Sequence, residues 1–512
     1  MAHAETVVLD GSPLSEDQVV AVSRHGAKVV VGERVPGVMA ESRRVVESHL
    51  GGDRPVYGLT TGFGALADVR IAREDLARLQ ANLIRSHAAG AGEPLPPEIV
   101  RAMMLLRART LASGRSGVRP LLVERIADVL NAGITPSVPS RGSVGASGDL
   151  AQLAHAALCL LGEGRVLART GTEPTADALR RAGIEPIELA AKEGLALVNG
   201  TDGMLALGTL GLHDVRSLLI AVDVAGAMSI EAALGTDRPF AQDVASLRPH
   251  PGHAESAANL RALLDGSAIT ASHRDSTHAV QDPYSMRCAP QVHGAARDTA
   301  RFAADVFDRE RASIVDNPVI LADGRVESTG NFHGEPLAYA LDLLAIALCG
   351  VASISERRTY WILGPGQDRG LPPFLSTEAG LGSGYMLAQY TQASLVTECK
   401  LLAQPAGIDS IPTSGSQEDH VSMGWISGLK LRRAIEHVTT VIAIEAMVAA
   451  QALDIRNADP APGTRAALRT IRTRIPFLDR DRDLSVDIAA AEELVRDGAL
   501  TAAAGIEVGE LR

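Results

Sequence analysis

The chain has 512 residues, of which 46% are hydrophobic and 21% charged, and its formal net charge is −12. This composition can bury a large core and excludes extended disorder, and the acidic balance gives no attraction for nucleic acid or anionic lipid. Only 3% of the residues are aromatic, so Ala, Leu, Val and Ile must build the core, which favours helices.

The start of the chain, its apolar runs and its cysteines predict a cytoplasmic protein without a membrane or metal partner. The stretch "MAHAETVVLDG" has no basic region followed by an apolar one, and apolar runs such as residues 343–355 are shorter than a membrane span requires. The cysteines lie far apart, which fits neither a disulfide framework nor a metal site, and we expect buried free thiols. These are Cys159, Cys288, Cys349 and Cys399.

Glycine and proline separate a series of helical patterns along the chain. The segment from Pro96 to Gly114 has prolines at its start and glycine at its end, as helices do. Beyond about Asn199 the helical stretches lengthen, over residues 297–315 and 429–455, as in helix bundles. We therefore predict a mainly α protein, with an N-terminal domain over residues 1–210 and a long central and C-terminal bundle over residues 211–512.

The stretch "RGSVGASGDL", residues 141–150, offers bare backbone just before an apolar segment. It lacks the Gly-x-Ser-x-Gly spacing of a hydrolase elbow, so a conventional serine nucleophile is disfavoured. The nitrogen of Gly148 could instead attack the carbonyl of Ala146, closing a ring that loses water, and loss of the Ser147 hydroxyl would leave an alkene. The tripeptide alone is equally explained by a loop that leads into a helix.

The surrounding motifs decide between these alternatives. "GSVGASGDLAQLAH" resembles the characteristic segment of the ammonia-lyases and aminomutases that carry a 4-methylidene-imidazol-5-one (MIO) group. Further similar motifs lie on both sides of this segment, and together they span some 360 residues in the family's order. They are "YGLTTGFG" from Tyr57, "SHAAG" from Ser86, "EGLALVNGTDG" from Glu193, "VQDPYSMRCAPQV" from Val280, "DNPVI" from Asp316, "GNFHGEP" from Gly330, "LPPFL" from Leu371 and "QEDHVSMG" from Gln417.

The resemblance implies an aromatic ammonia-lyase fold with an MIO group formed from Ala146, Ser147 and Gly148. It also implies a homotetramer whose active sites draw residues from three chains, and the chemistry requires no metal or diffusible cofactor. Helices that begin near the ring, one of them near Asp149, would increase its electron demand through their positive ends.

By the same resemblance, Tyr57 is the base that removes a β-proton, which requires surroundings that lower its pKa. The implied catalytic set is Tyr57, Ala146, Ser147, Gly148, Tyr284 and Glu418. The implied substrate-binding set is His87, Asn199, Gln281, Arg287, Phe332 and Met386. Without the resemblance, several of these would be ordinary turn, surface or core residues, and Arg287 owes its assignment to the bidentate grip that a guanidinium offers a carboxylate.

Three residues carry the prediction of the substrate. His87 continues a helical face with Leu76, Leu79 and Leu83, where members of the family that act on polar rings have a polar group. Glu418 would hold an imidazole, although Ser416 to Asp419 also has the pattern of a helix capping box. With Met386, these residues favour conversion of L-histidine to trans-urocanate and ammonia. The alternative is a tyrosine or phenylalanine ammonia-lyase or an aromatic 2,3-aminomutase.

Departures from the family pattern leave that choice open. Gln152 replaces a usual proline, Asp202 follows Asn-Gly-Thr where other residues are frequent, and residues 364–370 form an unusual loop. An inactive binding homologue is disfavoured by the joint presence of Tyr57, Ser147 and Arg287.

Overall fold

The computed structural model describes residues 6–50, 55–275, 279–364 and 370–512. These residues are mostly helical, and the strands among them are short, which confirms the predicted fold class. They divide into two compact units. The first unit comprises Met1–Leu210, Ala304–Leu341 and Pro405–Leu429, and the second comprises Gly211–Ala303, Asp342–Gln404 and Lys430–Arg512.

The chain enters the first unit three times. By the contacts within each unit, residues 304–341 and 405–429 return to the first unit after the chain has left it at Leu210. The division into two domains at residue 210 stays a prediction. Four helices contribute residues to both units because boundaries fall inside them. These helices are α9 (Asp202–Ala232), α14 (Ala289–Ala312), α15 (Glu335–Leu363) and α17 (Gly424–Arg456).

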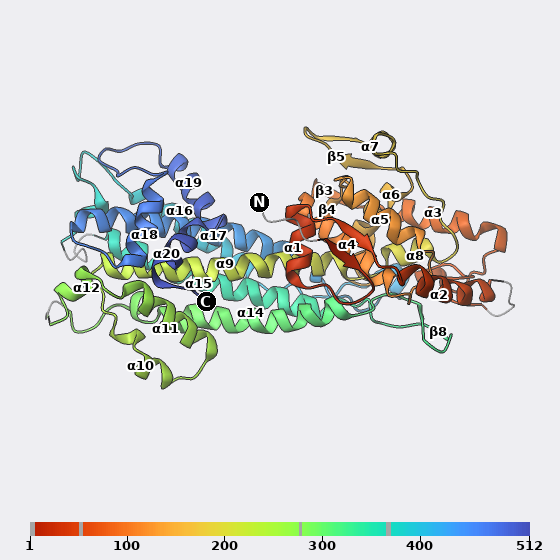
Figure 1. Ribbon diagram of the computed structural model, residues 1–512, viewed down its shortest axis with the longest axis horizontal. Coiled ribbons are helices and arrows are strands. Elements are labelled where there is room, and N and C mark those ends of the chain that lie inside the picture. The colour runs from red at the N-terminus through yellow and green to blue at the C-terminus, as the bar shows by residue number, and fades with distance from the viewer. Residues whose placement is uncertain (1–5, 51–54, 276–278, 365–369) are drawn as a thin grey trace. The chain divides into compact units, whose positions relative to one another are not determined.

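Short helices and two-stranded sheets form the rest of the first unit (Figure 1). Its α-helices are α1 (Glu16–His25), α2 (Val35–His49), α3 (Leu76–His87), α4 (Pro97–Ala112), α5 (Leu121–Asn131), α6 (Leu150–Leu160), α7 (Thr175–Ala182) and α8 (Glu193–Val198). Single turns of 3-10 helix lie at Gly64–Leu66, Arg73–Asp75 and Ser414–Ser416.

The strands pair locally. Strands β1 (Val7–Leu9) and β2 (Val29–Val31) are parallel, with Val7 opposite Val29. The other pairs are antiparallel, and they are β3 (Ala91–Pro94) with β4 (Pro139–Arg141), β5 (Arg165–Leu167) with β6 (Thr172–Pro174), and β7 (Val319–Ile320) with β8 (Val326–Glu327). No strand among the described residues exceeds four residues, so helices supply the core.

Helices α3, α6 and α8 pack against one another. On α3, Leu76 and Leu83 are buried, as their helical spacing predicts. The predicted helix from Pro96 is confirmed as α4, with prolines at its first turn and nearly all of its residues buried. Gln152, which replaces the usual proline, lies within α6 and donates to the carbonyl of Pro139.

The second unit contains further helices besides its share of the four long ones. These are α10 (Gln242–Ser246), α11 (Pro251–Leu264), α12 (Ala268–Ser272), α13 (Tyr284–Arg287), α16 (Met386–Leu402), α18 (Pro462–Arg472), α19 (Leu484–Arg496) and α20 (Ala499–Val508), with 3-10 turns at Arg238–Phe240 and Pro373–Leu375. Helix α18 packs on α11 and α20. Of the loop 364–370, residues 365–369 lie outside the described residues.

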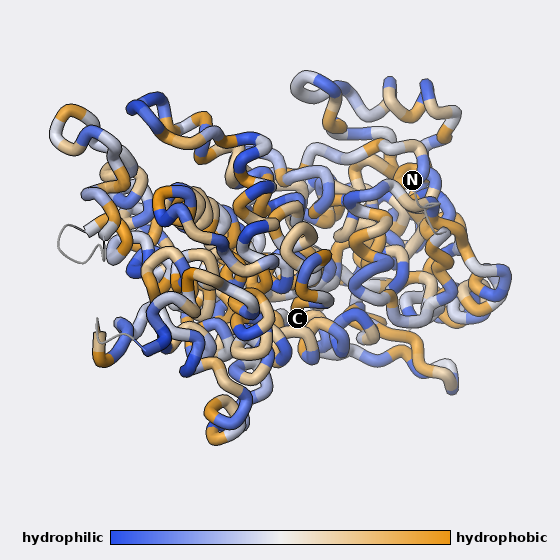
Figure 2. The backbone as a smooth tube through the Cα atoms, turned by 60° about the vertical axis from the view of Figure 1, so that its left-hand side comes forward, coloured by the Kyte–Doolittle hydropathy of each residue, from blue (hydrophilic) through white to orange (hydrophobic). Residues whose placement is uncertain are grey.

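The apolar stretches are longer than the sequence pattern suggested. Helices α9, α15 and α17 each contain an 18-residue window that is long and apolar enough to cross a membrane, judged by length and composition. Those windows are 72%, 61% and 83% buried within the protein, which is the environment of core helices. Figure 2 shows apolar and polar residues mixed along most of the backbone.

The four cysteines are free, as predicted. Cys159 and Cys399 are buried, and burial raises the pKa of each thiol to about 12. The prediction of burial was wrong for Cys288 and Cys349, which are half-buried.

Candidate active site

The glycine-rich loop before α6 has a backbone shape that glycine adopts without strain. Gly145 and Gly148 have φ angles of +66° and +74°, in the left-handed region. A β-carbon at Gly148 would lie 2.0 Å from the carbonyl oxygen of Gly200, with which Gly148 forms a parallel bridge. Only glycine therefore fits as the third residue of the Ala-Ser-Gly tripeptide.

Several helices begin around this loop. Helix α6 begins at Leu150, directly after it, as the sequence indicated. The amide of Met204, in the first turn of α9, donates to Asp149 Oδ2 over 2.7 Å. The amide of Met423, just before α17, donates to the carbonyl of Val144 over 2.8 Å. The positive ends of three helices thus lie near the tripeptide, where they favour developing negative charge.

Beside the loop lies a cavity of about 940 Å³, formed within the first unit. Helix α3 contributes Leu79, Leu83 and His87 to its wall. Seven of the residues assigned from the sequence line it, and they are Tyr57, His87, Ala146, Ser147, Asn199, Phe332 and Glu418. Residues that are 361 positions apart in the chain are therefore gathered around one space large enough for an amino acid substrate.

Ser147 and Glu418 meet across this cavity. The hydroxyl of Ser147 donates to Glu418 Oε1 over 2.9 Å, and the hydroxyl of Thr413 donates to Glu418 Oε2 over 2.7 Å. The capping-box interpretation of Glu418 was wrong, because no helix begins there. Glu418 pairs with Thr413 in an isolated bridge, and α17 begins only at Gly424.

The groups of this chain raise the pKa of Tyr57, contrary to the lowering that its assigned role requires. Burial is the main cause, and the Glu418 carboxylate adds to it, while the bond from the amide of Gly64 to the tyrosine hydroxyl acts in the opposite direction. For His87, burial lowers the pKa, although a bond to the backbone of Leu83 and the charge of Glu418 raise it.

Asn199 offers a buried acceptor at the cavity. Its Nδ2 donates to the backbone carbonyl of Asn317 over 3.0 Å, and the backbone carbonyl of Asn199 accepts from Arg107. Its Oδ1 is buried and has no hydrogen-bond partner among the described residues. Because an unpaired buried oxygen is costly, this atom is suited to accept from a bound ligand, such as an ammonium group.

Of the five remaining assigned residues, Gly148 lies in the first unit next to Ser147, and the other four lie in the second unit; none of the five is among the cavity's lining residues. Gln281 and Tyr284 are exposed, and Met386 is half-buried at the start of α16. The guanidinium of Arg287 lies 4.7 Å from the centre of the Tyr284 ring, and its Nε donates to the carbonyl of Asp282. Tyr284 and Arg287 thus contact each other on α13.

Sequence reasoning missed some polar residues of the site. Asp149 is fully buried, and burial raises its pKa to about 7, against the bonds from Met204 and Ser143. His333 and His420 line the cavity, although they lie 87 positions apart. Asp149 could have been found from its position directly after the tripeptide. No local spacing connects His333 with His420.

The comparisons with known proteins agree with this fold. The chain matches the family described as aromatic amino acid lyase over residues 14–473. It belongs to the aromatic amino acid lyase family. Its fold is that of solved members, including the tyrosine aminomutase from Streptomyces globisporus, with a TM-score of 0.94 at 36% identity over 99% of this chain and all of that one.

Among curated relatives, the chain is 51% identical over 510 residues to a histidine ammonia-lyase from Streptomyces coelicolor, covering 99% of this chain and 100% of the relative. It is 50% identical to a histidine ammonia-lyase from Anaeromyxobacter dehalogenans, over 97% and 99% of the two chains. The structure of histidine ammonia-lyase from Trypanosoma cruzi matches with a TM-score of 0.90 at 39% identity, over 99% of this chain and 96% of that one.

Proposed function

We propose that this protein is a histidine ammonia-lyase, which converts L-histidine to trans-urocanate and ammonia without oxidation. The observation that carries the proposal is the Glu418 carboxylate beside Ser147 in a cavity that also receives His87. Full-length relatives of about half identity that bear this name support the same substrate.

The residues around Ser147 fit an MIO group made from Ala146, Ser147 and Gly148. Gly148 has the conformation and the close contact that exclude any side chain, and Ala146 packs in a small apolar cluster with Val421 and Met423. When formed, this group supplies an electrophilic alkene that takes up an amino group and makes it a better leaving group.

Ring formation would also release Glu418. Its Oε1 accepts from the Ser147 hydroxyl, which is the group lost as water when the ring forms. The oxygen then becomes available to accept from the N–H of a substrate imidazole, in a charge-assisted hydrogen bond. Thr413 keeps the carboxylate in place through Oε2, so the orientation of Glu418 does not depend on Ser147.

Tyr57 removes the β-proton in this proposal, and it must be ionised to do so. Because burial and Glu418 raise its pKa, a cation from outside this set of residues has to lower it. Arg287 is the candidate, and it would come from a neighbouring subunit together with Tyr284 and Gln281. The need for a cation from outside supports sites that are completed across subunits, in the homotetramer that the family resemblance implies.

A product assay tests the proposed reaction. Purified enzyme is incubated separately with L-histidine, L-tyrosine and L-phenylalanine, with Ser147→Ala as control. We expect urocanate and an equal amount of ammonia from L-histidine, both absent with the variant. Coumarate, cinnamate or a β-amino acid as the main product would overturn the histidine assignment and favour an aromatic lyase or an aminomutase, the class of the Streptomyces globisporus structure.

A further inference from the structure

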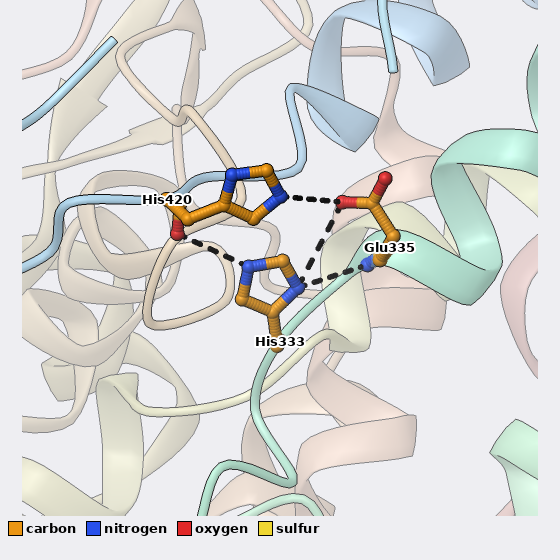
Figure 3. A group of neighbouring side chains, drawn as sticks. All are labelled: His333, Glu335 and His420. Carbon is orange, nitrogen blue, oxygen red and sulfur yellow. Dashed lines mark hydrogen bonds and ion pairs between the residues drawn. The ribbon is translucent and has the colours of Figure 1, made fainter. Parts of the chain in front are cut away.

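Two histidines that line the cavity, His333 and His420, converge with the glutamate Glu335 (Figure 3). His333 and Glu335 lie on either side of Gly334 where α15 begins, and His420 lies in the loop before α17. One ligand atom from each residue lies within 4.8 Å of the other two. The imidazole rings are stacked, with centres 5.8 Å apart and planes 5° from parallel.

Hydrogen bonds fix which nitrogen of His333 carries the proton. Nε2 lies 3.1 Å from the carbonyl oxygen of His420, and since a carbonyl can only accept, Nε2 must be the donor. Nδ1 therefore carries the one lone pair of the ring, which faces the amide of Glu335 at 3.4 Å, and a metal ion bound to Nδ1 would replace this long hydrogen bond. Histidines that bind metals commonly have this arrangement, with the second ring nitrogen donating to a backbone carbonyl.

The carboxylate of Glu335 has an unused oxygen at the same point. Oε2 is buried and accepts no hydrogen bond from the described residues. It lies 4.0 Å from Nδ1 of His333 and 4.0 Å from Nε2 of His420, distances too long for hydrogen bonds. A cation placed between this carboxylate oxygen and the two imidazole nitrogens would satisfy all three atoms.

We propose that His333, Glu335 and His420 bind a divalent transition-metal ion, and Zn²⁺ is the ion we would test. Two imidazoles and one carboxylate are a ligand set that zinc uses, with a fourth position left for water. Ligands about 2.1 Å from a tetrahedral ion lie about 3.4 Å apart, so the three groups need to approach by about an ångström. His420 can make that movement because its side chain is 70% exposed.

Such an ion would connect two segments that form the cavity. Phe332 immediately precedes His333, and Glu418 lies two residues before His420. An ion shared by the two histidines therefore restrains the segments that carry these cavity residues. The site goes beyond the proposed function, because elimination of ammonia by this chain requires no metal.

Zinc binding to the full-length protein tests the proposal. Protein dialysed against a chelator is titrated calorimetrically with ZnCl2, and we expect one saturable site per chain and an upward shift of the thermal midpoint with zinc. Glu335→Gln and His420→Ala should each weaken binding by about tenfold or more, since even changes behind the ligands cost about 10-fold to 100-fold. His437→Ala is the matched control, because His437 also pairs with a glutamate, Glu398, at 3.1 Å.

Two further measurements keep the outcome decisive. Co²⁺ bound to the unmodified protein should give the visible absorption bands of a nitrogen- and oxygen-ligated ion. This measurement does not require any variant to fold. Glu418→Gln should bind zinc as tightly as the unmodified protein. The proposal is overturned if no stoichiometric binding occurs, if Glu335→Gln and His420→Ala bind normally, or if Glu418→Gln is the variant that loses the ion, which would place the ion inside the cavity.

Discussion

Gly148 is the residue at which backbone geometry and proposed chemistry depend on each other most directly. We predict that Gly148→Ala abolishes activity, because its new methyl group would lie 2.0 Å from the carbonyl oxygen of Gly200 and displace the tripeptide from its present conformation. The variant should lack both urocanate formation and the near-ultraviolet absorbance of the ring, the result that we also expect for Ser147→Ala.

Gly133 provides the matched control for this substitution. It also has a positive φ, +68°, but its β-carbon would meet no atom within 4 Å. Gly133→Ala should therefore lose about 1–2 kcal/mol of stability from backbone strain alone and keep its activity. A Gly148→Ala protein with normal ring absorbance would contradict the importance of the contact with Gly200.

Asp149 gives a prediction with a defined pH window. Its pKa is 3.8 in an unfolded chain and about 7 in the folded one, chiefly because it is buried. Between these values only the folded state holds the proton, so this carboxyl lowers stability progressively as pH rises from about 4 to 7. Asp149→Asn removes the titration and should become more stable relative to the unmodified protein across that window.

Thermal unfolding at a series of pH values measures this difference. Asp323→Asn is the control, because Asp323 is exposed and Arg325 lowers its pKa. This variant should not become more stable than the unmodified protein as the pH rises. If the difference between Asp149→Asn and the unmodified protein does not change between pH 4 and pH 8, the buried carboxyl does not retain its proton.

At the scale of elements, the buried carboxylate of Glu445 connects three long helices in the second unit. Glu445 on α17 accepts from Arg358 on α15, from Ser355 on α15 and from Ser229 on α9. Glu445, Arg358, Ser229 and Ser355 are fully buried. Such a group stabilises the packing only while every partner is present, since an isolated buried charge is costly.

We therefore predict that Arg358→Met lowers the free energy of unfolding by about 3–5 kcal/mol, because it leaves the Glu445 charge without its cation. Adding Glu445→Leu to this variant should recover much of the loss, since the pair is then replaced by apolar groups of similar volume. Urea denaturation of the two single variants and the double variant gives the coupling. Additive losses would show that the two side chains do not interact in the folded protein.

Helices and their boundaries were predictable where the signal is local. The prolines before α4 and the apolar spacing of α3 define those helices, and the loop before α6 marks its start. The pattern around Glu418 failed because a capping box is only a local preference. A glycine with φ of +61° inside the turn at Ser414–Ser416 and the bridge from Thr413 to Glu418 direct that chain into a loop.

The site itself was predictable only through family resemblance. Ser147 and Glu418 are 271 positions apart, and no periodicity relates them. The zinc ligands His333 and His420 escaped notice for the same reason, since the tertiary fold brings the segments together. The pKa of Tyr57 was expected to be lowered, and the residues of one chain raise it, because burial outweighs the single amide that donates to the hydroxyl.

At the scale of the whole molecule, the distribution of the assigned residues leads to a test of assembly. Ser147 and Tyr57 line one cavity of a single chain, whereas Arg287 and Tyr284 belong to the other unit and do not line it. If neighbouring subunits complete each site, a subunit with defective Arg287 can still provide an intact Ser147 to a neighbour that supplies the arginine.

We predict that Ser147→Ala and Arg287→Ala homo-oligomers are each inactive but regain activity when co-expressed and purified together. With random mixing in a symmetric tetramer, about a quarter of the sites receive both intact residues. Urocanate formation by the mixed enzyme, relative to the unmodified one, measures that fraction. Ser147→Ala mixed with Tyr57→Phe should recover nothing, because both residues belong to the same cavity in the same chain. Recovery in this control, or none with Arg287→Ala, would mean that the sites are not completed across subunits.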